Sequence, residues 1–136
     1  MKKSILLVYQ IVAGIADAAT GAMLIAAPSF TLHRMQLDVP PDALPFLSFI
    51  GAFVLAVGLS YLYGALLMRR TGGGPRLEAI WLVTAIVRSS VAVFVVAAIA
   101  GGSLEPGWST IAFFDGACVL LQAVGLRKGW LSDVAR

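Results

Sequence analysis

Four long apolar segments constrain this sequence more than any other feature. They run from about residue 4 to 27, from 43 to 68, from 79 to 100 and from 107 to 126. One helical crossing of a bilayer needs about 20 predominantly apolar residues, so a chain of 136 residues has room for four crossings with short connections. The pattern predicts an all-α fold, in which residues 1–136 form a single integral-membrane domain built as an up-and-down four-helix bundle.

The composition excludes the soluble alternatives. Hydrophobic residues make up 60% of the chain and charged residues only 12%, whereas soluble domains carry about 45–50% apolar and about 25% charged residues. The chain therefore has too little charge to cover a water-facing surface. A soluble globular domain, a disordered chain and a nucleic-acid binder are all excluded, and we expect membrane lipids as the surrounding partner.

The remaining charges are distributed unevenly between the two ends of the segments. Eight of the ten Lys and Arg residues lie at the N-terminus, in the connection near residues 69–76, or at the C-terminus. Asp38, Asp42 and Glu105 lie in the other two connections, where Arg34 is the only basic residue. This alternation follows the positive-inside rule and predicts that both termini are cytoplasmic.

Two further patterns concern the membrane surfaces. Trp108 lies near the expected outer boundary, and Trp81 and Trp130 lie near the inner one, as is typical of an interfacial aromatic belt. The connection over residues 29–37 mixes Phe, Leu and Met with polar residues. That mixture fits either a segment lying flat on the outer membrane surface or a disordered loop.

Three charged residues lie inside the apolar segments: Asp17, Arg88 and Asp115. Such charges are rare in spanning helices, because inserting each one costs roughly 2.5–3.5 kcal/mol. At about 1.5 Å of rise per residue, they lie roughly 20, 14 and 17 Å from the cytoplasmic ends of their helices, respectively. An Arg side chain is long enough to cover that difference, so we expect the three to meet near the middle of the membrane.

Polar uncharged residues accompany these three charges on their helices. Residues three, four or seven positions apart share one helix face. The residues so placed are Gln10 and Thr20 beside Asp17, Thr84 beside Arg88, and Gln122 beside Asp115. Together with the three charges they form the predicted site for a ligand or a proton.

Two interpretations of these residues remain open. In the first, Arg88 and one carboxylate form a buried pair that only fixes helix packing. In the second, the cluster is functional, because two carboxylates and one guanidinium leave a net charge of −1 that must be removed by protonation, a cation or water access. We expect Arg88 to pair with Asp115 and Asp17 to be the carboxylate that titrates.

The sequence lacks the residue patterns of catalytic, phosphate-binding and metal-binding sites. It contains no nucleophile with an identifiable base, no Gly-rich phosphate loop and no cluster of metal ligands. The single histidine, His33, lies in a connection, and the single cysteine, Cys118, lies within the last apolar segment. We therefore expect no cofactor and no metal, and an enzyme is the least supported class.

Short motifs in the second, third and fourth segments resemble a known group of proteins. They are Ile50-Gly51-Ala52-Phe53, Val57-Gly58-Leu59, Arg88, Asp115 through Gln122, and Gly125-Leu126. With them the chain resembles the small four-helix bacterial membrane proteins described as DoxX-like, and its Asp17-Ala-Ala-Thr20-Gly21 start resembles other uncharacterised proteins. The resemblance implies a location in the bacterial inner membrane. Some DoxX-like proteins are associated with quinone-linked or thiol redox systems, but this chain has no cysteine pair for thiol chemistry.

The chain also resembles the small multidrug-resistance transporters, which are four short helices with an acidic residue in the first. Asp17 matches that residue. The strong charge bias and the intramembrane Arg88 depart from that family, in which dual-topology members have little charge bias.

The sequence thus supports three functional hypotheses. In the first, the polar cluster binds a small ligand or a proton. In the second, the chain is a structural or accessory subunit of a larger membrane complex. In the third, it is a small proton-coupled transporter, which would act as a homodimer or larger oligomer because so short a chain encloses little volume.

Overall fold

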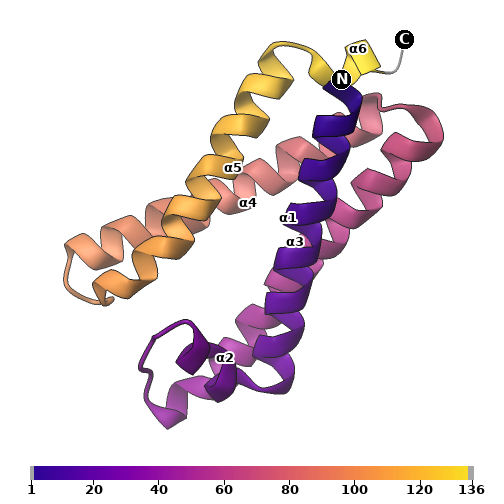
Figure 1. Cartoon of the computed structure of the whole chain (residues 1–136). Coiled ribbons are helices and arrows are strands. Elements are labelled where there is room, and N and C mark those ends of the chain that lie inside the picture. The colour runs from indigo at the N-terminus through magenta and orange to yellow at the C-terminus, as the bar shows by residue number, and fades with distance from the viewer. Residues whose placement is uncertain (1, 135–136) are drawn as a thin grey trace. The chain divides into compact units, whose positions relative to one another are not determined.

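Helices make up nearly all of the chain in this computed structural model, which describes residues 2–134 (Figure 1). The elements, in order, are α1 (Lys2–Ala26), α2 (Pro28–Arg34), η1 (Pro41–Ala43), α3 (Leu44–Thr71), α4 (Pro75–Ala100), η2 (Pro106–Trp108), α5 (Ser109–Arg127) and α6 (Trp130–Val134). The described residues contain no strand, which confirms the predicted all-α class. Four helices, α1, α3, α4 and α5, have the length and apolar composition to cross a membrane, as a multi-pass membrane protein requires.

The long helices extend beyond some of the predicted segments. Helix α4 begins at Pro75 rather than near residue 79, because proline at the first helical position lacks only an N–H that would have no intrahelical partner. Helix α3 continues through Arg69 and Arg70 to Thr71, since long basic side chains can reach polar surroundings while their backbone stays helical. Helix α5 begins at Ser109, after the short turn η2, slightly later than predicted.

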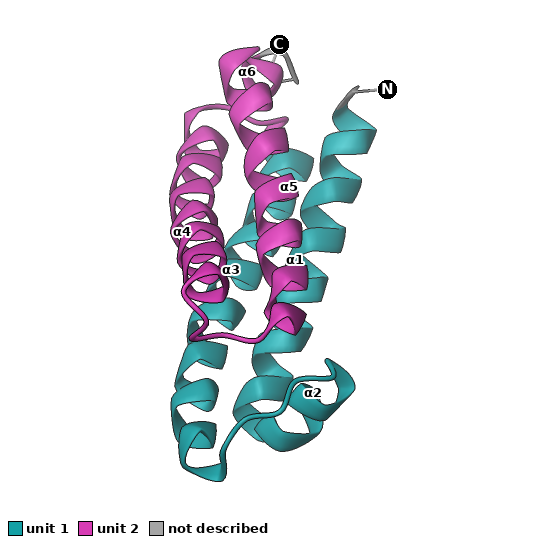
Figure 2. Cartoon of the chain, turned by 90° about the vertical axis from the view of Figure 1, so that its left-hand side faces the viewer, with its two compact units in different colours: residues 1–70 teal, residues 71–136 magenta. Residues whose placement is uncertain are grey.

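The chain divides into two compact units, Met1–Arg70 and Thr71–Arg136, shown in teal and magenta in Figure 2. In the first unit, α1 and α3 form an antiparallel hairpin whose backbones touch at glycines. A Cβ atom on Gly21 would lie 2.3 Å from the backbone nitrogen of Leu55, and one on Gly58 would lie 2.3 Å from that of Ala18. Small residues permit this close approach between membrane helices.

The connection over residues 29–37 is ordered and closes one end of the first unit. It contains α2, whose Thr31 and Leu32 are buried, and the following Leu37 is buried as well. The Thr31 hydroxyl donates to the carbonyl of Ala27 at 2.8 Å, while the Phe30 ring stays 60% exposed. Of the two alternatives for this connection, the structure therefore excludes the disordered loop.

In the second unit, α4 and α5 also form an antiparallel hairpin. The buried residues of α4 follow one another at alternating steps of four and three, and those of α5 do the same. They are Leu77, Trp81, Thr84 and Arg88 on α4, followed seven residues later by Val95, and Asp115, Cys118, Gln122 and Gly125 on α5. Residues at such steps form a narrow stripe on one face of a helix, and two helices that cross at a small angle stay in contact along it. We call the buried residues of this stripe on both helices the α4–α5 seam.

The short helix α6 closes one end of the α4–α5 seam. Leu131 of α6 is 1% exposed, and the Ser132 hydroxyl donates to a carboxylate oxygen of Glu78 on α4. A Cβ atom on Gly125 would lie 2.6 Å from the Trp81 ring and 3.0 Å from the Trp130 ring. Trp81 is thus fully buried, which corrects the expectation that its ring belongs to the interfacial belt: Gly125 leaves space for the ring inside the hairpin.

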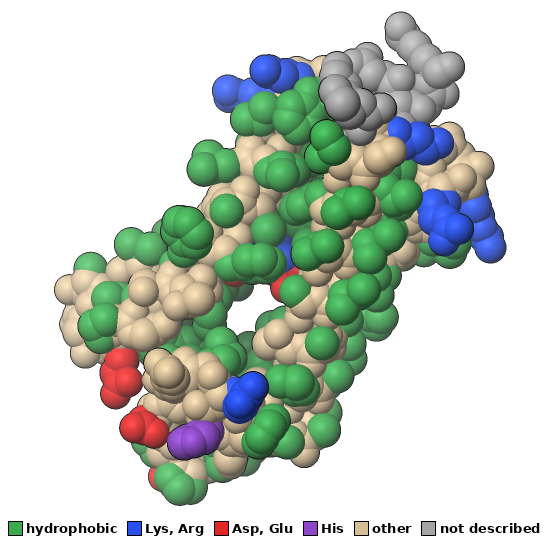
Figure 3. All heavy atoms as spheres, viewed as in Figure 1, with side chains coloured by type: hydrophobic (Ala, Val, Ile, Leu, Met, Phe, Trp, Pro, Cys, Tyr) green, Lys and Arg blue, Asp and Glu red, His purple; other side chains and the backbone are tan. Residues whose placement is uncertain are grey.

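The outward faces of the long helices are strongly apolar. The exposed side chains include Val93 and Phe94 on α4, and Phe113 and Leu120 on α5. In Figure 3, hydrophobic side chains follow the visible lengths of the helices, and most charged side chains lie near the helix ends. Such continuous apolar faces are expected where hydrocarbon, rather than water, is the surrounding solvent.

Candidate functional site

An ion pair between α4 and α5 lies at the centre of the α4–α5 seam. Nη1 of Arg88 donates to Oδ1 of Asp115, and the two residues are only 3% and 8% exposed. This is the pairing expected from the sequence. Because both charges are removed from water, their mutual attraction offsets part of the cost of burying them.

The helical register explains why these two residues face each other. Arg88 lies four residues after Thr84 and seven after Trp81, so the three share one stripe of α4. Arg88 contacts Asp115 of the antiparallel helix α5. Thr84, one turn before Arg88, contacts Gln122, two turns after Asp115. Both polar contacts therefore arise from a single register of the hairpin.

The second polar contact is a short chain of hydrogen bonds. Nε2 of Gln122 donates to Oγ1 of Thr84 at 2.8 Å, and that hydroxyl in turn donates to the carbonyl of Ile80 at 2.8 Å. Gln122 is fully buried, yet its Oε1 has no hydrogen-bond partner within the described part of the chain. The seam thus contains a buried acceptor that is free to receive a hydrogen bond.

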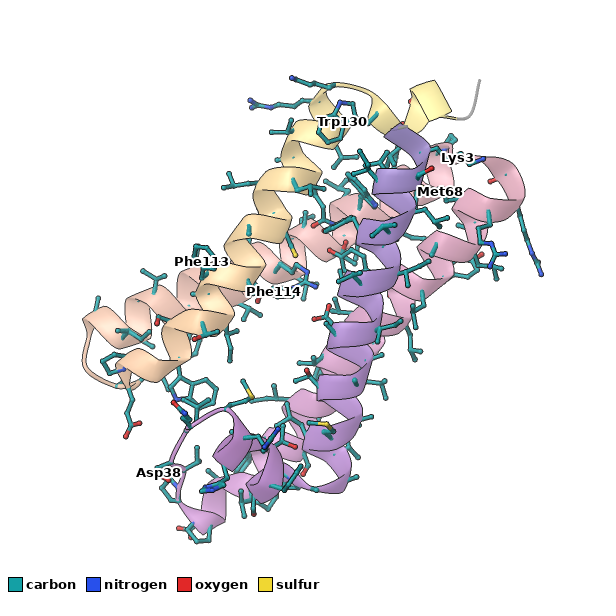
Figure 4. All side chains as sticks on the ribbon, viewed as in Figure 1. Lys3, Asp38, Met68, Phe113, Phe114 and Trp130 are labelled. Atoms are coloured by element: carbon teal, nitrogen blue, oxygen red, sulfur yellow. The ribbon has the colours of Figure 1, made fainter. Side chains whose placement is uncertain are left out.

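Phe114 adds a contact that the sequence analysis missed. The Cζ atom of Arg88 lies 5.2 Å from the centroid of the Phe114 ring, within the range of a cation–π interaction. Phe113 and Phe114 project from successive positions of α5 in Figure 4, and Phe113 is 81% exposed. An apolar residue in an apolar helix carries no distinguishing signal, so only the structure could identify this one.

The charges of the α4–α5 seam sum to zero. Arg88 contributes one positive charge and Asp115 one negative charge, while Thr84 and Gln122 are uncharged. A neutral set of buried polar groups can persist in a low-dielectric environment provided that its hydrogen bonds are made. The free Oε1 of Gln122 is the one exception found within the described seam.

The other three predicted site residues lie on α1, in the first unit. Gln10 is fully buried, Asp17 is 8% exposed, and Thr20 is half-buried. Gln10 and Asp17 lie seven positions apart and share one face of α1, as expected from helical spacing. The meeting of Asp17 with Arg88 and Asp115 stays a prediction.

A tyrosine pair in the first unit was not among the predicted site residues. Tyr9 of α1 and Tyr61 of α3 have hydroxyl oxygens 3.1 Å apart, and their rings meet edge to face with centroids separated by 5.7 Å. Tyr61 is fully buried, whereas Tyr63 is 52% exposed. Their spacing of two residues places them on different faces of α3, and only the packing showed which of them points inward.

The described residues contain no group of three or more His, Cys, Asp or Glu side chains that could hold a metal ion. His33 is exposed on α2, and Cys118 is buried in the seam, between Asp115 and Gln122 in the sequence. Neither residue is therefore part of a recognisable ligand cluster in this structure.

No protein-family model, curated protein or solved structure matches this chain. The chemistry of its own buried polar residues is therefore the basis for inferring its function.

Proposed function

We propose that this chain is a multi-pass protein of the bacterial inner membrane whose buried polar residues bind a small ligand or a proton. The α4–α5 seam provides the proposed binding residues of the second unit, and Asp17, Gln10 and Thr20 of α1 are those of the first. The observation that supports the proposal best is the buried Arg88–Asp115 ion pair, accompanied in the same seam by a free acceptor on Gln122.

Energetics favour a functional origin for these residues. A buried ion pair contributes little net stability, and replacing such a pair by well-packed hydrophobic residues is often neutral or stabilising by about 1–4 kcal/mol. Ionisable residues in spanning helices typically mark binding or proton-transfer sites. Two helices that needed only to pack could do so with the apolar residues that make up the rest of the chain.

Asp17 is the residue that we assign to proton binding. Arg88 already pairs with Asp115, so a third charge from Asp17 would leave the proposed site with a net charge of −1. A low-dielectric site favours removal of such an excess charge, either by protonation or by a bound cationic ligand.

The charge distribution of each hairpin supports an orientation with both termini in the cytoplasm. In the first unit, Lys3, Arg69 and Arg70 lie at one end of the antiparallel hairpin, and Asp38 and Asp42 lie in the connection at the other. In the second unit, Arg76, Arg127 and Lys128 lie at the end opposite to Glu105. Positive charges of short loops stay on the cytoplasmic side. We also propose membership of the DoxX-like group, on the motifs quoted above.

A structural role is the second candidate. It is favoured by the observation that Arg88 already receives both the Asp115 carboxylate and the Phe114 ring from one neighbouring helix. In that case the pair would fix the register of the hairpin, and the exposed apolar faces would contact lipids, a second copy of the chain or a larger membrane complex. A proton-coupled transporter acting as an oligomer would use the same faces for assembly.

A thermal-shift screen of the purified full chain tests the proposal. We expect the melting temperature of the wild type to respond to pH or to at least one class of small ligand, and Asp17→Asn to reduce that response. Asp42→Asn is the matched control, because Asp42 is an exposed carboxylate outside the long helices. A melting temperature indifferent to pH, to every ligand class and to Asp17→Asn would leave only the structural role.

A further inference from the structure

The amide group of Gln122 has a defined orientation in the α4–α5 seam. The hydroxyl proton of Thr84 is donated to the carbonyl of Ile80, so Thr84 can only accept a hydrogen bond from Gln122. Nε2 of Gln122 supplies that bond, which leaves Oε1 as the free atom. A glutamine carbonyl oxygen accepts up to two hydrogen bonds, and a buried acceptor that receives none lowers stability.

The surroundings of Gln122 restrict what could bind to this oxygen. One turn toward the C-terminus, Gly125 lies against the Trp81 ring, and one turn toward the N-terminus lies the buried Cys118. The residues one turn before and one turn after Gln122 on α5 are therefore small and uncharged. Within the seam, Arg88 and Asp115 carry opposite charges, so an uncharged donor would satisfy Oε1 of Gln122 without changing the charge of the four polar residues of the seam.

We propose that Oε1 of Gln122 accepts a hydrogen bond from the hydroxyl group of a small uncharged ligand whose apolar part packs near Trp81. The inference rests on the proposed ligand-binding function and names the ligand class for that site. A hydroxyl group supplies the missing donor without adding charge. The ligand must be small, because the 2.8 Å bond between Gln122 and Thr84 holds the two helices close together.

Two probes of similar size distinguish the contribution of the hydroxyl group. Benzyl alcohol carries one, and toluene lacks it. Binding of each to the purified full chain in detergent is followed by tryptophan fluorescence and by the shift in melting temperature. We expect benzyl alcohol to bind about five- to tenfold more tightly than toluene, as one net hydrogen bond provides.

Substitution of Gln122 tests whether that preference arises at this residue. In Gln122→Met the acceptor is lost but a side chain of similar length remains, and the Thr84 hydroxyl keeps its bond to Ile80. We therefore expect the variant to fold and to bind both probes equally. Gln122→Leu is a second variant with the same expectation, and Thr110→Val, which removes an exposed hydroxyl from the same helix, should retain the wild-type preference.

Each outcome decides the inference. Equal binding of the two probes to the wild type, or no binding of either, overturns it, because the free acceptor then takes no ligand hydroxyl. A preference that persists in both Gln122 variants also overturns it. If the wild type ignores both probes but responds to pH or to charged ligands in the thermal-shift screen, the ligand class is wrong and the proposed function stands.

Discussion

Arg88 is held by two consecutive residues of α5, and this arrangement determines what its removal would do. Asp115 provides the ion pair, and Phe114 places its ring 5.2 Å from the guanidinium carbon. Asp115 is only 8% exposed, so its carboxylate cannot regain hydration simply by turning outward. The cost of breaking the pair is therefore dominated by the charge that is left behind, and not by the bond that is lost.

Arg88→Ala should destabilise the protein by about 3–5 kcal/mol, since it leaves the Asp115 carboxylate buried without its partner. The double variant Arg88→Ala/Asp115→Ala should lose clearly less, because the Asp115 carboxylate is removed together with its partner. Unfolding free energies measured by denaturant titration in mixed micelles compare the two variants. Equal losses would show that the pair is not the reason for the damage.

Tyr61 and Tyr63 provide a matched comparison on α3. Tyr61→Phe removes a buried hydroxyl that lies 3.1 Å from the hydroxyl of Tyr9, and we expect a loss of about 0.5–1.5 kcal/mol in unfolding free energy. Tyr63→Phe changes a side chain that is 52% exposed and should cost almost nothing. The same mixed-micelle titration measures both. A larger loss for Tyr63→Phe would contradict the assignment of the buried face.

At the scale of helices, each hairpin is assembled around positions where a side chain would not fit. Gly21 and Gly58 let the backbones of α1 and α3 touch, and Gly125 makes space for the rings of Trp81 and Trp130 beside α5. Gly116, which also lies on α5, has open space where its Cβ would be. A methyl group would therefore clash at Gly21, Gly58 and Gly125 but not at Gly116.

Gly58→Ala should be strongly destabilising, and Gly116→Ala should not. The new Cβ of Gly58→Ala would lie 2.3 Å from the backbone nitrogen of Ala18, so the helices must separate, at a cost of about 1–3 kcal/mol. Gly116→Ala meets no atom and gains helix propensity, by up to about 1 kcal/mol. Melting temperatures of the two variants in the same detergent test the difference. A similar loss in both would mean that α1 and α3 do not approach this closely.

Gly125→Ala tests the end of the α4–α5 seam. Its Cβ would lie 2.6 Å from the fully buried ring of Trp81, so the ring must shift, and we expect a lower melting temperature and altered tryptophan fluorescence. Gly116→Ala serves again as the control on the same helix. Unchanged fluorescence in Gly125→Ala would contradict the placement of the Trp81 ring.

For the whole molecule, the positions of charges along the two hairpins determine the expected orientation. Most basic residues lie at one end of each hairpin, and the connections that carry Asp38, Asp42 and Glu105 lie at the other. Both hairpins should therefore insert with their basic ends in the cytoplasm. The scarcity of charge elsewhere in the chain is what allows so few residues to determine the topology.

Cysteine labelling in intact cells tests this orientation. In a Cys118→Ala background, Ser103→Cys in the connection between α4 and α5 should react with a membrane-impermeant maleimide added outside the cytoplasmic membrane. Gly73→Cys, between α3 and α4, should react only after the membrane is permeabilised. Cys118 itself is buried and should react poorly in the wild type. Labelling of Gly73→Cys from outside would reverse the topology.

Features that depend on residues close together in the sequence could be predicted from it. The four long helices follow from local hydropathy, since a membrane requires about 20 apolar residues in each crossing. The shared faces of Thr84 and Arg88, and of Asp115 and Gln122, follow from helical periodicity. The scarcity of charge was enough to single out Asp17, Arg88 and Asp115, and their similar levels along the helices led to the expectation that Arg88 pairs with Asp115.

Only the tertiary structure decided which atoms meet across each hairpin. The bond from Gln122 to Thr84, the ring of Phe114 beside Arg88, and the burial of Trp81 against Gly125 all depend on the register of α4 against α5. Helical periodicity determines the face on which a residue lies, but not its level along a neighbouring helix. That level is set by the simultaneous packing of side chains from both helices, which no single segment of the sequence contains.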